Sequence, residues 1–272
     1  MVIRHNLSGM NANRNLNINN DSAAKSSEKL SSGYRINRAG DDAAGLAISE
    51  KMRSQIRGLD QGSTNAQDGI SMVQTTEGAL NETQSMLQRL KTLATQASNG
   101  TLTSSDRTQV QKEVVELKSE IDRIASQTQF NGMNVLDGSA STVRFQVGAN
   151  ANQTISLDLS SNMNTTTLGI NNIDLSSVGG AESAMTLIDT AINSVSSKRA
   201  TFGAVQNRLE HTVTATDNTS ENLSAAESRI RDVDMAKEYM NYSQQNVLVQ
   251  AAQSMLSHAN SSSQNVLSLL QG

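Results

Sequence analysis

The sequence predicts a mainly α-helical fold, an elongated antiparallel helical bundle or coiled coil with a small β-hairpin region. Three observations support this: long stretches with heptad-spaced apolar residues, no proline in 272 residues, and an aromatic content of 2%. Heptad spacing gives a helix a single apolar seam for a partner helix. The chain lacks the main helix breaker, and with so few aromatic rings its burial depends on aliphatic side chains.

The heptad pattern occupies three segments. The strictest lies between residues 106 and 128, where the apolar positions alternate in steps of four and three: Val110, Val114, Leu117, Ile121 and Ile124. The other two seams comprise Val73, Leu80, Leu87, Leu90, Ala94 and Ala97, and Met185, Ile188, Ile192, Val195, Phe202, Leu209 and Val213. Long helices with one seam each pack against other helices, which favours a structural role over a catalytic pocket.

Capping residues and glycines indicate the element boundaries. Asp42 suits an N-cap, Asn99-Gly100 a C-cap, and Ser104-Ser105-Asp106 the start of the next helix. The helix between residues 42 and 98 contains four glycines that we expect to weaken it: Gly58, Gly62, Gly69 and Gly78. Two period-two runs around the turn-rich segment 148–152 predict the β-hairpin, with Val143, Phe145 and Val147 on one strand and Ile155, Leu157 and Leu159 on the other.

The two ends of the chain carry weaker patterns. Residues 1–45 are rich in Asn and Ser with few apolar positions, and further helices are expected over residues 182–217 and from Leu223 to the C-terminus. A pair of helices with narrow apolar stripes buries too little surface to offset its conformational entropy. From the layout of the chain we expect the N-terminal helices to return and meet the C-terminal ones. Because their apolar stripes are narrow, we expect them to be disordered in the monomer until neighbouring subunits cover them.

Composition excludes most chemical sites. The chain has no cysteine, so disulfides and thiolate metal ligands are absent. Its three histidines, His5, His211 and His258, form no metal-binding spacing, and no phosphate-binding glycine loop or nucleophile elbow occurs. We therefore expect no catalytic residues, no cofactor and no metal, and a protein that is not an enzyme.

Charge and hydropathy limit the partners. The net charge of −4 gives no reason to expect nucleic acid, and no apolar run is long enough to insert into a membrane. The N-terminal residues lack the apolar core of a general secretory signal, which by itself indicates a cytosolic protein. Four basic residues are interleaved with acids and are interpreted as solvated helix faces: Arg89, Lys91, Arg107 and Arg123.

Four blocks of the sequence, in order, resemble the terminal regions of bacterial flagellin. They are LSSGYRINRAGDDAAGLAISEKMR (30–53), DGISMVQTTEGALNE (68–82), QTQFNGMNVLDG (127–138) and ENLSAAESRIRDVDMAKE (221–238). The ending NVLSLLQ (265–271) is also similar. The resemblance covers the chain except for about residues 139–180 and implies a short form that lacks the large variable surface domains.

The resemblance implies a subunit with two nested layers. Residues 1–45 and 225–272 would form paired helices lining the inner tube of a filament. Residues 46–138 would form the N-terminal half of a rod domain with two long helices, 139–180 its hairpin and short variable segment, and 181–224 its C-terminal helix. The residues expected to make assembly contacts are Leu7, Leu30, Ile230, Val233, Met240, Val247, Leu269 and Leu270.

The resemblance also implies the function, a structural subunit that self-polymerises into the bacterial flagellar filament for swimming motility. Flagellins are threaded unfolded through the flagellar secretion channel. The resemblance therefore overturns the cytosolic expectation and implies a secreted, extracellular component of the flagellum. It further implies an export chaperone at the C-terminal helix, about residues 230–272, and the filament cap and hook-junction proteins as partners.

A vertebrate Toll-like receptor recognises many flagellins, and the resemblance extends to the surface involved. The receptor-contacting Arg, Leu and Glu of the family match Arg89, Leu93 and Glu113. The family often has Arg and Glu where this chain has Lys91 and Thr92. The resemblance thus implies innate immune recognition through a surface whose first role is subunit packing.

Two other functions stay open at the level of sequence. A hook–filament junction protein shares the terminal architecture, although the ESRIRDVDMAKE block and the NVLSLLQ ending favour flagellin itself. A cytoplasmic signalling coiled coil would also show heptads, but it would normally carry a membrane anchor or a sensor domain, and neither pattern is present. Electron microscopy of long filaments grown from the purified chain would separate these alternatives.

Overall fold

A computed structural model describes the chain from residue 6 to residue 271, with all side chains except those of residues 263 and 266–271. Its elements follow in the order α1 (Leu7–Ser32), α2 (Ala43–Ala97), α3 (Ser104–Gln127), β1 (Gln129–Phe130), β2 (Met133–Asn134), β3 (Thr142–Gln146), β4 (Thr154–Asp158), α4 (Val178–Arg231) and α5 (Met235–Gln271). Contacts divide the chain into two compact units: unit 1 comprises Met1–Ser54 with Asn222–Gly272, and unit 2 comprises Gln55–Glu221. The mainly α-helical fold class is confirmed.

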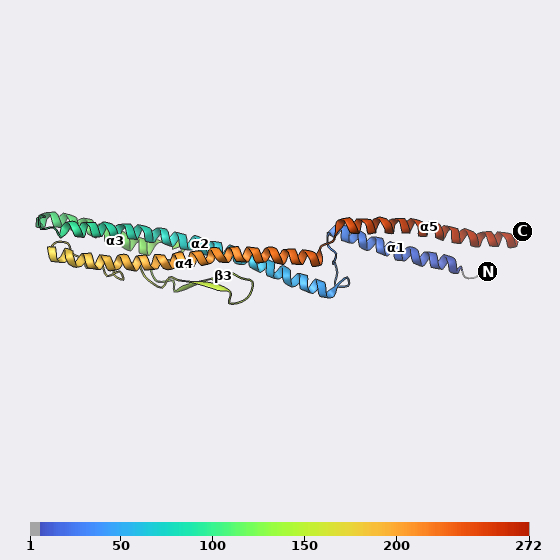
Figure 1. Cartoon of the computed structure of the whole chain (residues 1–272), viewed down its shortest axis with the longest axis horizontal. Helices are drawn as coiled ribbons and strands as arrows, with labels where there is room; N and C mark the ends of the chain where they lie inside the picture. The colour runs from blue at the N-terminus through green and yellow to red at the C-terminus, as the bar shows by residue number, and fades with distance from the viewer. Residues whose placement is uncertain (1–5, 272) are drawn as a thin grey trace. The chain divides into compact units, whose positions relative to one another are not determined.

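In unit 2, helices α2 and α4 run antiparallel. Side-chain hydrogen bonds join Asp60 to Ser220, Gln84 to Arg199, and Lys91 to Asp189. Residue numbers therefore rise along α2 as they fall along α4. Helix α3 packs beside them as the third helix, and β3 lies along the same bundle (Figure 1). The predicted antiparallel helical bundle is therefore present in this unit.

The three heptad seams form the core of unit 2. All six predicted positions of the α2 seam are buried, together with Val114 and Ile121 of α3 and Ile188, Val195, Phe202 and Leu209 of α4. The other seam positions are partly buried against this core: Val110, Leu117, Ile124, Met185, Ile192 and Val213. Each large aliphatic side chain stabilises the fold by about 1.5–3 kcal/mol when buried. These seams are thus covered by helices of the same chain.

A buried arginine closes the turn between α2 and α3. Arg107, which is 8% exposed, donates from Nε to the carbonyl oxygen of Ala97 and from Nη2 to that of Asn99, both at 2.9 Å. Carbonyl groups in the last turn of a helix lack a donor within the helix. The interpretation of Arg107 as part of a solvated face is therefore wrong, because its guanidinium satisfies the end of α2.

Helix α3 begins at Ser104, as Ser104-Ser105-Asp106 predicts, and the residue before it is the N-cap. The N-cap is Thr103, whose side chain accepts a hydrogen bond from the N–H of Asp106 while the Asp106 carboxylate accepts one from the N–H of Thr103. This is a capping box, in which two otherwise unpaired donors are satisfied reciprocally. The predicted N-cap at Asp42 is confirmed, since its Oδ1 accepts a hydrogen bond from the N–H of Gly45 at 2.8 Å.

The predicted β-hairpin is confirmed as the antiparallel pair of β3 and β4. Val143 lies opposite Leu157, and Phe145 opposite Ile155, as their alternation requires. The side chains of Ile155 and Leu157 are buried, whereas the polar residues between them are exposed. One face of the hairpin therefore joins the core of unit 2.

A second, shorter hairpin was not predicted. Strands β1 and β2 pair through a two-residue turn made by Asn131 and Gly132, whose φ angles of 49° and 77° are both positive. Asn-Gly is the sequence most typical of such turns, because both residues tolerate this left-handed backbone. Strands of two residues are too short to show a period of two, so only the turn was visible in the sequence.

Two of the glycines in α2 allow the β3–β4 connection to lie directly on the helix. A Cβ atom on Gly58 would lie 2.7 Å from the Cβ of Ala149, and one on Gly62 would lie 2.7 Å from the backbone carbonyl of Val147. The expectation that these glycines only weaken the helix is incomplete, since the missing side chain makes room for the hairpin. Gly78 has no such neighbour within 4 Å.

Residues 160–177 form no helix or strand and are fastened to α3 by polar contacts. The carboxylate of Asp122 accepts hydrogen bonds from the N–H and the hydroxyl of Thr165, at 2.8 and 2.9 Å. The side-chain oxygen of Gln111 accepts one from the N–H of Leu175 at 2.8 Å. These contacts hold residues 160–177 against α3 although the segment has no regular secondary structure.

A four-residue motif recurs three times in this part of unit 2. Each copy has a buried Leu or Ile, then Asp, one further residue and Ser: residues 136–139, 157–160 and 173–176. Each Asp carboxylate accepts hydrogen bonds from the N–H and the hydroxyl of its Ser. The pKa values of Asp137 and Asp158 are lowered mainly by the hydrogen bond from the Ser hydroxyl. The pKa of Asp174 is lowered mainly by the hydrogen bond from the Ser N–H.

These turns predict a loss of stability in acid. Because the three pKa values are lower in the folded chain than in the unfolded one, the turns contribute stability above the unfolded pKa of about 3.9, and lose it as the pH falls through the folded values. We expect the free energy of unfolding, measured by urea titration, to decline between about pH 5 and pH 2.

The matched control replaces Asp137, Asp158 and Asp174 together with asparagine. The amide oxygen of asparagine can still accept the hydrogen bonds of the turn but carries no proton that titrates. The decline with falling pH should therefore be shallower in the variant. Identical slopes for the variant and the natural chain would contradict the assignment.

In unit 1, α1 and α5 form an antiparallel pair (Figure 1). At the start of α1, the amide of Asn6 donates to the carbonyl oxygen of Ala259 at 3.2 Å, and just past its end Tyr34 forms a β-bridge with Asp232. The predicted pairing of the terminal helices is therefore confirmed. Among the described side chains of this unit, Ile36 is the one large apolar group that is buried. Disorder of these helices in the monomer stays a prediction, and this sparse core favours it.

The boundary between the last two helices differs from the prediction. Helix α4 continues without interruption to Arg231, whereas the sequence predicted one helix ending at residue 217 and another beginning at Leu223. The residues between those positions include neither Gly nor Pro, so nothing interrupts the helix. The break lies at residues 232–234, where the carboxylate of Asp234 accepts hydrogen bonds from backbone N–H groups in the first turn of α5.

Candidate assembly surface

Helix α1 exposes large apolar side chains on one face. Leu7, Met10 and Ile18 are 67%, 65% and 54% exposed. At 3.6 residues per turn the three positions fall within an arc of about 80°. The opposite side faces α5, since Gly9 is buried and a Cβ there would lie 3.4 Å from the side-chain oxygen of Asn260.

Helix α5 carries a longer exposed stripe. Met240, Val247, Leu248 and Met255 are exposed and fall within an arc of about 100°. Met235 and Tyr239 add apolar surface at the start of the helix. We use the name assembly surface for these exposed residues of α1 and α5: Leu7, Met10, Ile18, Met235, Tyr239, Met240, Val247, Leu248 and Met255. Large apolar side chains that line up exposed along a helix of a folded protein mark a candidate site of association.

The residues predicted to make assembly contacts fall into three groups. Leu7, Met240 and Val247 belong to the assembly surface. Leu30, Ile230 and Val233 are half-buried within unit 1. The side chains of Leu269 and Leu270 lie outside the described residues. The prediction omitted six residues of the assembly surface, whose exposure depends on which side of each helix faces its partner: Met10, Ile18, Met235, Tyr239, Leu248 and Met255.

A junction within unit 1 ties the loop after α1 to the end of α4. The N–H of Arg35 donates to the carbonyl oxygen of Arg231 at 2.6 Å, and the N–H of Val233 donates to that of Gly33 at 3.0 Å. The guanidinium of Arg35 adds a hydrogen bond to the carbonyl oxygen of Ile230. The two blocks that contribute these residues, 30–53 and 221–238, are thus in contact despite being far apart in the sequence.

Arg231 is the central side chain of this junction. It pairs with Glu50 at 2.6 Å, and its guanidinium lies over the ring of Tyr34 at 4.8 Å from the centroid. The hydrogen bond from Arg231 is the main cause that lowers the pKa of Glu50. Beside this pair, the hydroxyl of Ser49 donates to the carboxylate of Glu227 at 2.9 Å. The junction is therefore built mainly from charge-assisted hydrogen bonds rather than apolar burial.

The residues matched to receptor contacts lie in unit 2. Arg89 of α2 pairs with Glu113 of α3 at 2.7 Å, and this pairing raises the pKa of Arg89. Both side chains are about half exposed. Leu93, by contrast, is 2% exposed and belongs to the core. The structure thus brings Arg89 and Glu113 together at the surface and places Leu93 beneath it.

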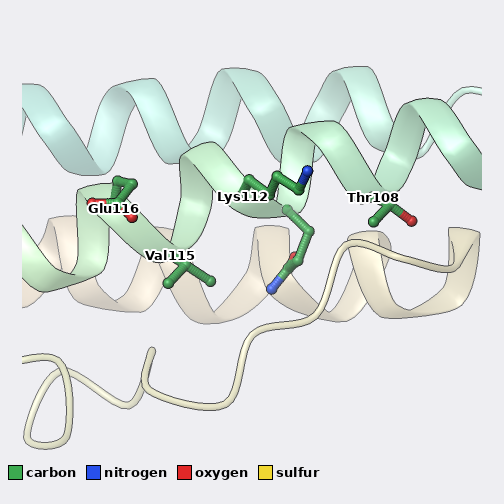
Figure 2. Close-up of a pocket in the computed structure, with 5 residues that line it drawn as sticks. Thr108, Lys112, Val115 and Glu116 are labelled. Carbon is green, nitrogen blue, oxygen red and sulfur yellow. The ribbon is translucent and has the colours of Figure 1, made fainter.

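A shallow depression of about 240 Å³ lies along α3 in the same unit. It is lined by Thr108, Gln111, Lys112, Val115 and Glu116, and Figure 2 shows four of these side chains following one another along the helix. They present one ammonium, one carboxylate, a hydroxyl, an amide and an apolar group.

Metal-ligating groups and membrane-spanning helices are both absent from the part of the chain that the structure describes. No group of three or more His, Cys, Asp or Glu side chains there is arranged to hold a metal ion. None of the helices in residues 6–271 has an apolar stretch long enough to cross a membrane. The heptad core is covered within the chain, and the paired terminal helices expose apolar faces. This combination is typical of self-associating structural proteins.

Comparison with protein-family models identifies the family within that class. Residues 3–141 match the bacterial flagellin N-terminal helical region, and residues 185–270 match the bacterial flagellin C-terminal helical region. The chain therefore belongs to the bacterial flagellin family. Members of this family are structural subunits of the flagellar filament and self-assemble into it.

Relatives and solved structures agree with this assignment. The chain is 54% identical over 271 residues to a flagellin of Halalkalibacterium halodurans, covering 99% of this chain and 100% of the relative. It is 48% identical over 304 residues to a flagellin of Bacillus subtilis, at the same two coverages. Its fold is similar to the crystal structure of Bacillus cereus flagellin, with a TM-score of 0.52, 34% identity, and coverage of 60% of this chain and 94% of that one.

Proposed function

We propose that this flagellin joins the filament by burying the assembly surface of α1 and α5 against neighbouring copies. In this proposal the paired terminal helices, residues 1–45 and 225–272, line the inner tube, and residues 46–224 form the outer rod layer. The observation that carries the proposal is the contrast between the two units. The heptad seams of unit 2 are covered within the chain, whereas the apolar faces of α1 and α5 are exposed.

A substitution at Val247 tests this role. Aspartate there would place an unpaired charge in the proposed contact, and burying such a charge is costly. We expect Val247→Asp to slow elongation from filament seeds by about a hundredfold or more, which corresponds to about 3 kcal/mol.

The matched control is Val247→Ile, which keeps the position apolar and should elongate like the natural chain. The melting temperature of unit 2 should be the same for both variants, because residue 247 lies in unit 1. Removal of residues 233–272 should abolish elongation. Normal elongation of the Asp variant would refute the proposed contact.

We further propose that the chain reaches the filament through the flagellar secretion channel, unfolded, and acts outside the cell. The sparse core of unit 1 supports this route because it offers little resistance to unfolding. The chain also has no disulfide that would have to be broken before it unfolds. An export chaperone would bind the C-terminal helix before secretion and cover its apolar stripe. The filament cap and hook-junction proteins complete the proposed set of flagellar partners.

Recognition by a vertebrate Toll-like receptor is a separate proposal, centred on Arg89 and Glu113. Replacing Arg89 with alanine should weaken receptor binding, measured with the purified receptor ectodomain. An exposed ion pair contributes only about 0–1 kcal/mol to stability, so the fold should be unaffected. Arg123→Ala is the matched control, because Arg123 forms a similar exposed pair with Glu120.

Equal binding by the natural chain and the Arg89→Ala variant would refute the receptor proposal. Leu93 is expected to act indirectly, since it is buried beneath this surface. A Leu93→Ala variant should lose receptor binding only to the extent that it loses stability.

A further inference from the structure

Methionines are concentrated on the assembly surface. Met10, Met235, Met240 and Met255 are 65%, 49%, 64% and 64% exposed, and all four lie on α1 or α5. In unit 2, Met72 and Met163 are buried and Met133 is 42% exposed. The chain has no cysteine that would compete for oxidants. The four exposed thioethers are therefore the sulfur groups of the terminal helices most accessible to a dissolved oxidant.

We propose that these four methionines form an oxidation-sensitive site that controls whether the unassembled chain can join a filament. The oxidant is of the peroxide class. A sulfur lone pair attacks one peroxide oxygen and the O–O bond breaks. The thioether, oxidised by two electrons, becomes a sulfoxide as the transferred oxygen loses its proton. The other oxygen takes up that proton and, with hydrogen peroxide as the oxidant, leaves as water.

The effect on assembly follows from the chemistry of the product and rests on the proposed role of the assembly surface. A sulfoxide is polar and accepts hydrogen bonds, whereas the thioether it replaces is apolar and flexible. Burying it against a neighbouring copy without a donor costs free energy. Sulfoxides at Met240 and Met255 would interrupt the exposed stripe of α5, and one at Met10 would interrupt that of α1.

The positions of the four methionines also predict that assembly protects them from oxidation. In the free chain the four methionines are between about half and two-thirds exposed. In a filament the same groups would be covered by neighbouring copies. The oxidation-sensitive form is thus the subunit before assembly, and the filament is the resistant form.

The experiment treats the full-length chain with hydrogen peroxide and maps sulfoxides by peptide mass spectrometry before seeded elongation is measured. We expect Met10, Met235, Met240 and Met255 to be oxidised before Met72 and Met163. Elongation should slow by about tenfold or more. Methionine sulfoxide reductases of both stereochemical classes should restore it.

Two variants separate the site from general damage. A chain with leucine at all four positions should elongate after peroxide at the rate measured for the same variant before peroxide, because its apolar side chains at these positions cannot be oxidised. Met133→Leu is the matched control: Met133 is exposed in unit 2, and its removal should give no protection.

The outcomes distinguish this proposal from the assembly role on which it rests. Failure of the untreated natural chain to elongate would contradict the assembly role, and this proposal with it. Normal elongation of a chain shown to carry the four sulfoxides would contradict the oxidation proposal alone. Loss of elongation that the reductases do not reverse would also contradict it.

Discussion

Replacing Leu87 with alanine is expected to lower the free energy of unfolding of unit 2 by about 2–5 kcal/mol. Leu87 is completely buried at the centre of the α2 seam. The substitution removes buried apolar atoms and leaves a cavity that the surrounding helices can close only in part. Chemical unfolding of the full-length chain, followed by circular dichroism, measures the change.

The matched control is Leu187→Ala on α4. Leu187 belongs to the same unit and has the same side chain, but it is 42% exposed. Its truncation should change the free energy of unfolding by less than about 1 kcal/mol. Similar losses from the two variants would show that the heptad seam is not the core of this unit.

Replacing Gly62 with alanine is expected to destabilise unit 2 by about 1–3 kcal/mol. The added Cβ would lie 2.7 Å from the backbone carbonyl carbon and oxygen of Val147 and 3.0 Å from the backbone nitrogen of Gly148. Backbone atoms cannot rotate away as a long side chain can, so the hairpin must shift from the helix. The hydrogen bond from Asn65 to the carbonyl oxygen of Gln146 should weaken with it.

Replacing Gly78 with alanine should change the free energy of unfolding in the opposite direction. Nothing lies within 4 Å of a Cβ built at that position, and alanine is favoured over glycine in a helix by about 1 kcal/mol. Gly78→Ala is therefore expected to stabilise the chain. Changes of the same sign at Gly62 and Gly78 would contradict the assignment of Gly62 as a packing contact.

Much of the fold follows from local spacing. The seams of α2, α3 and α4, the β3–β4 hairpin and the cap at Asp42 are all encoded by residues near one another in the sequence. Heptads and period-two runs report which side of an element is buried. The pairing of the terminal helices was also predicted, although the exposed apolar residues of α1 lie on the side opposite α5.

The features that could not be predicted depend on residues distant in the sequence. Arg107 looks like one more charge on a helix face, and only the end of α2 beside it shows that it is buried. Gly62 looks like a weak point until the hairpin is placed on it. The assembly surface is similar, because a stripe on α5 is exposed only where α1 does not cover it.

Amide hydrogen exchange, compared between dilute monomer and filament, tests the central claim most directly. Unit 2 should be protected in both states, because its seams are covered within the chain. The amides of α1 and α5 should exchange rapidly in the monomer and become protected only in the filament. Strong protection of α1 and α5 in dilute monomer would contradict the account, as would rapid exchange of these helices in the filament.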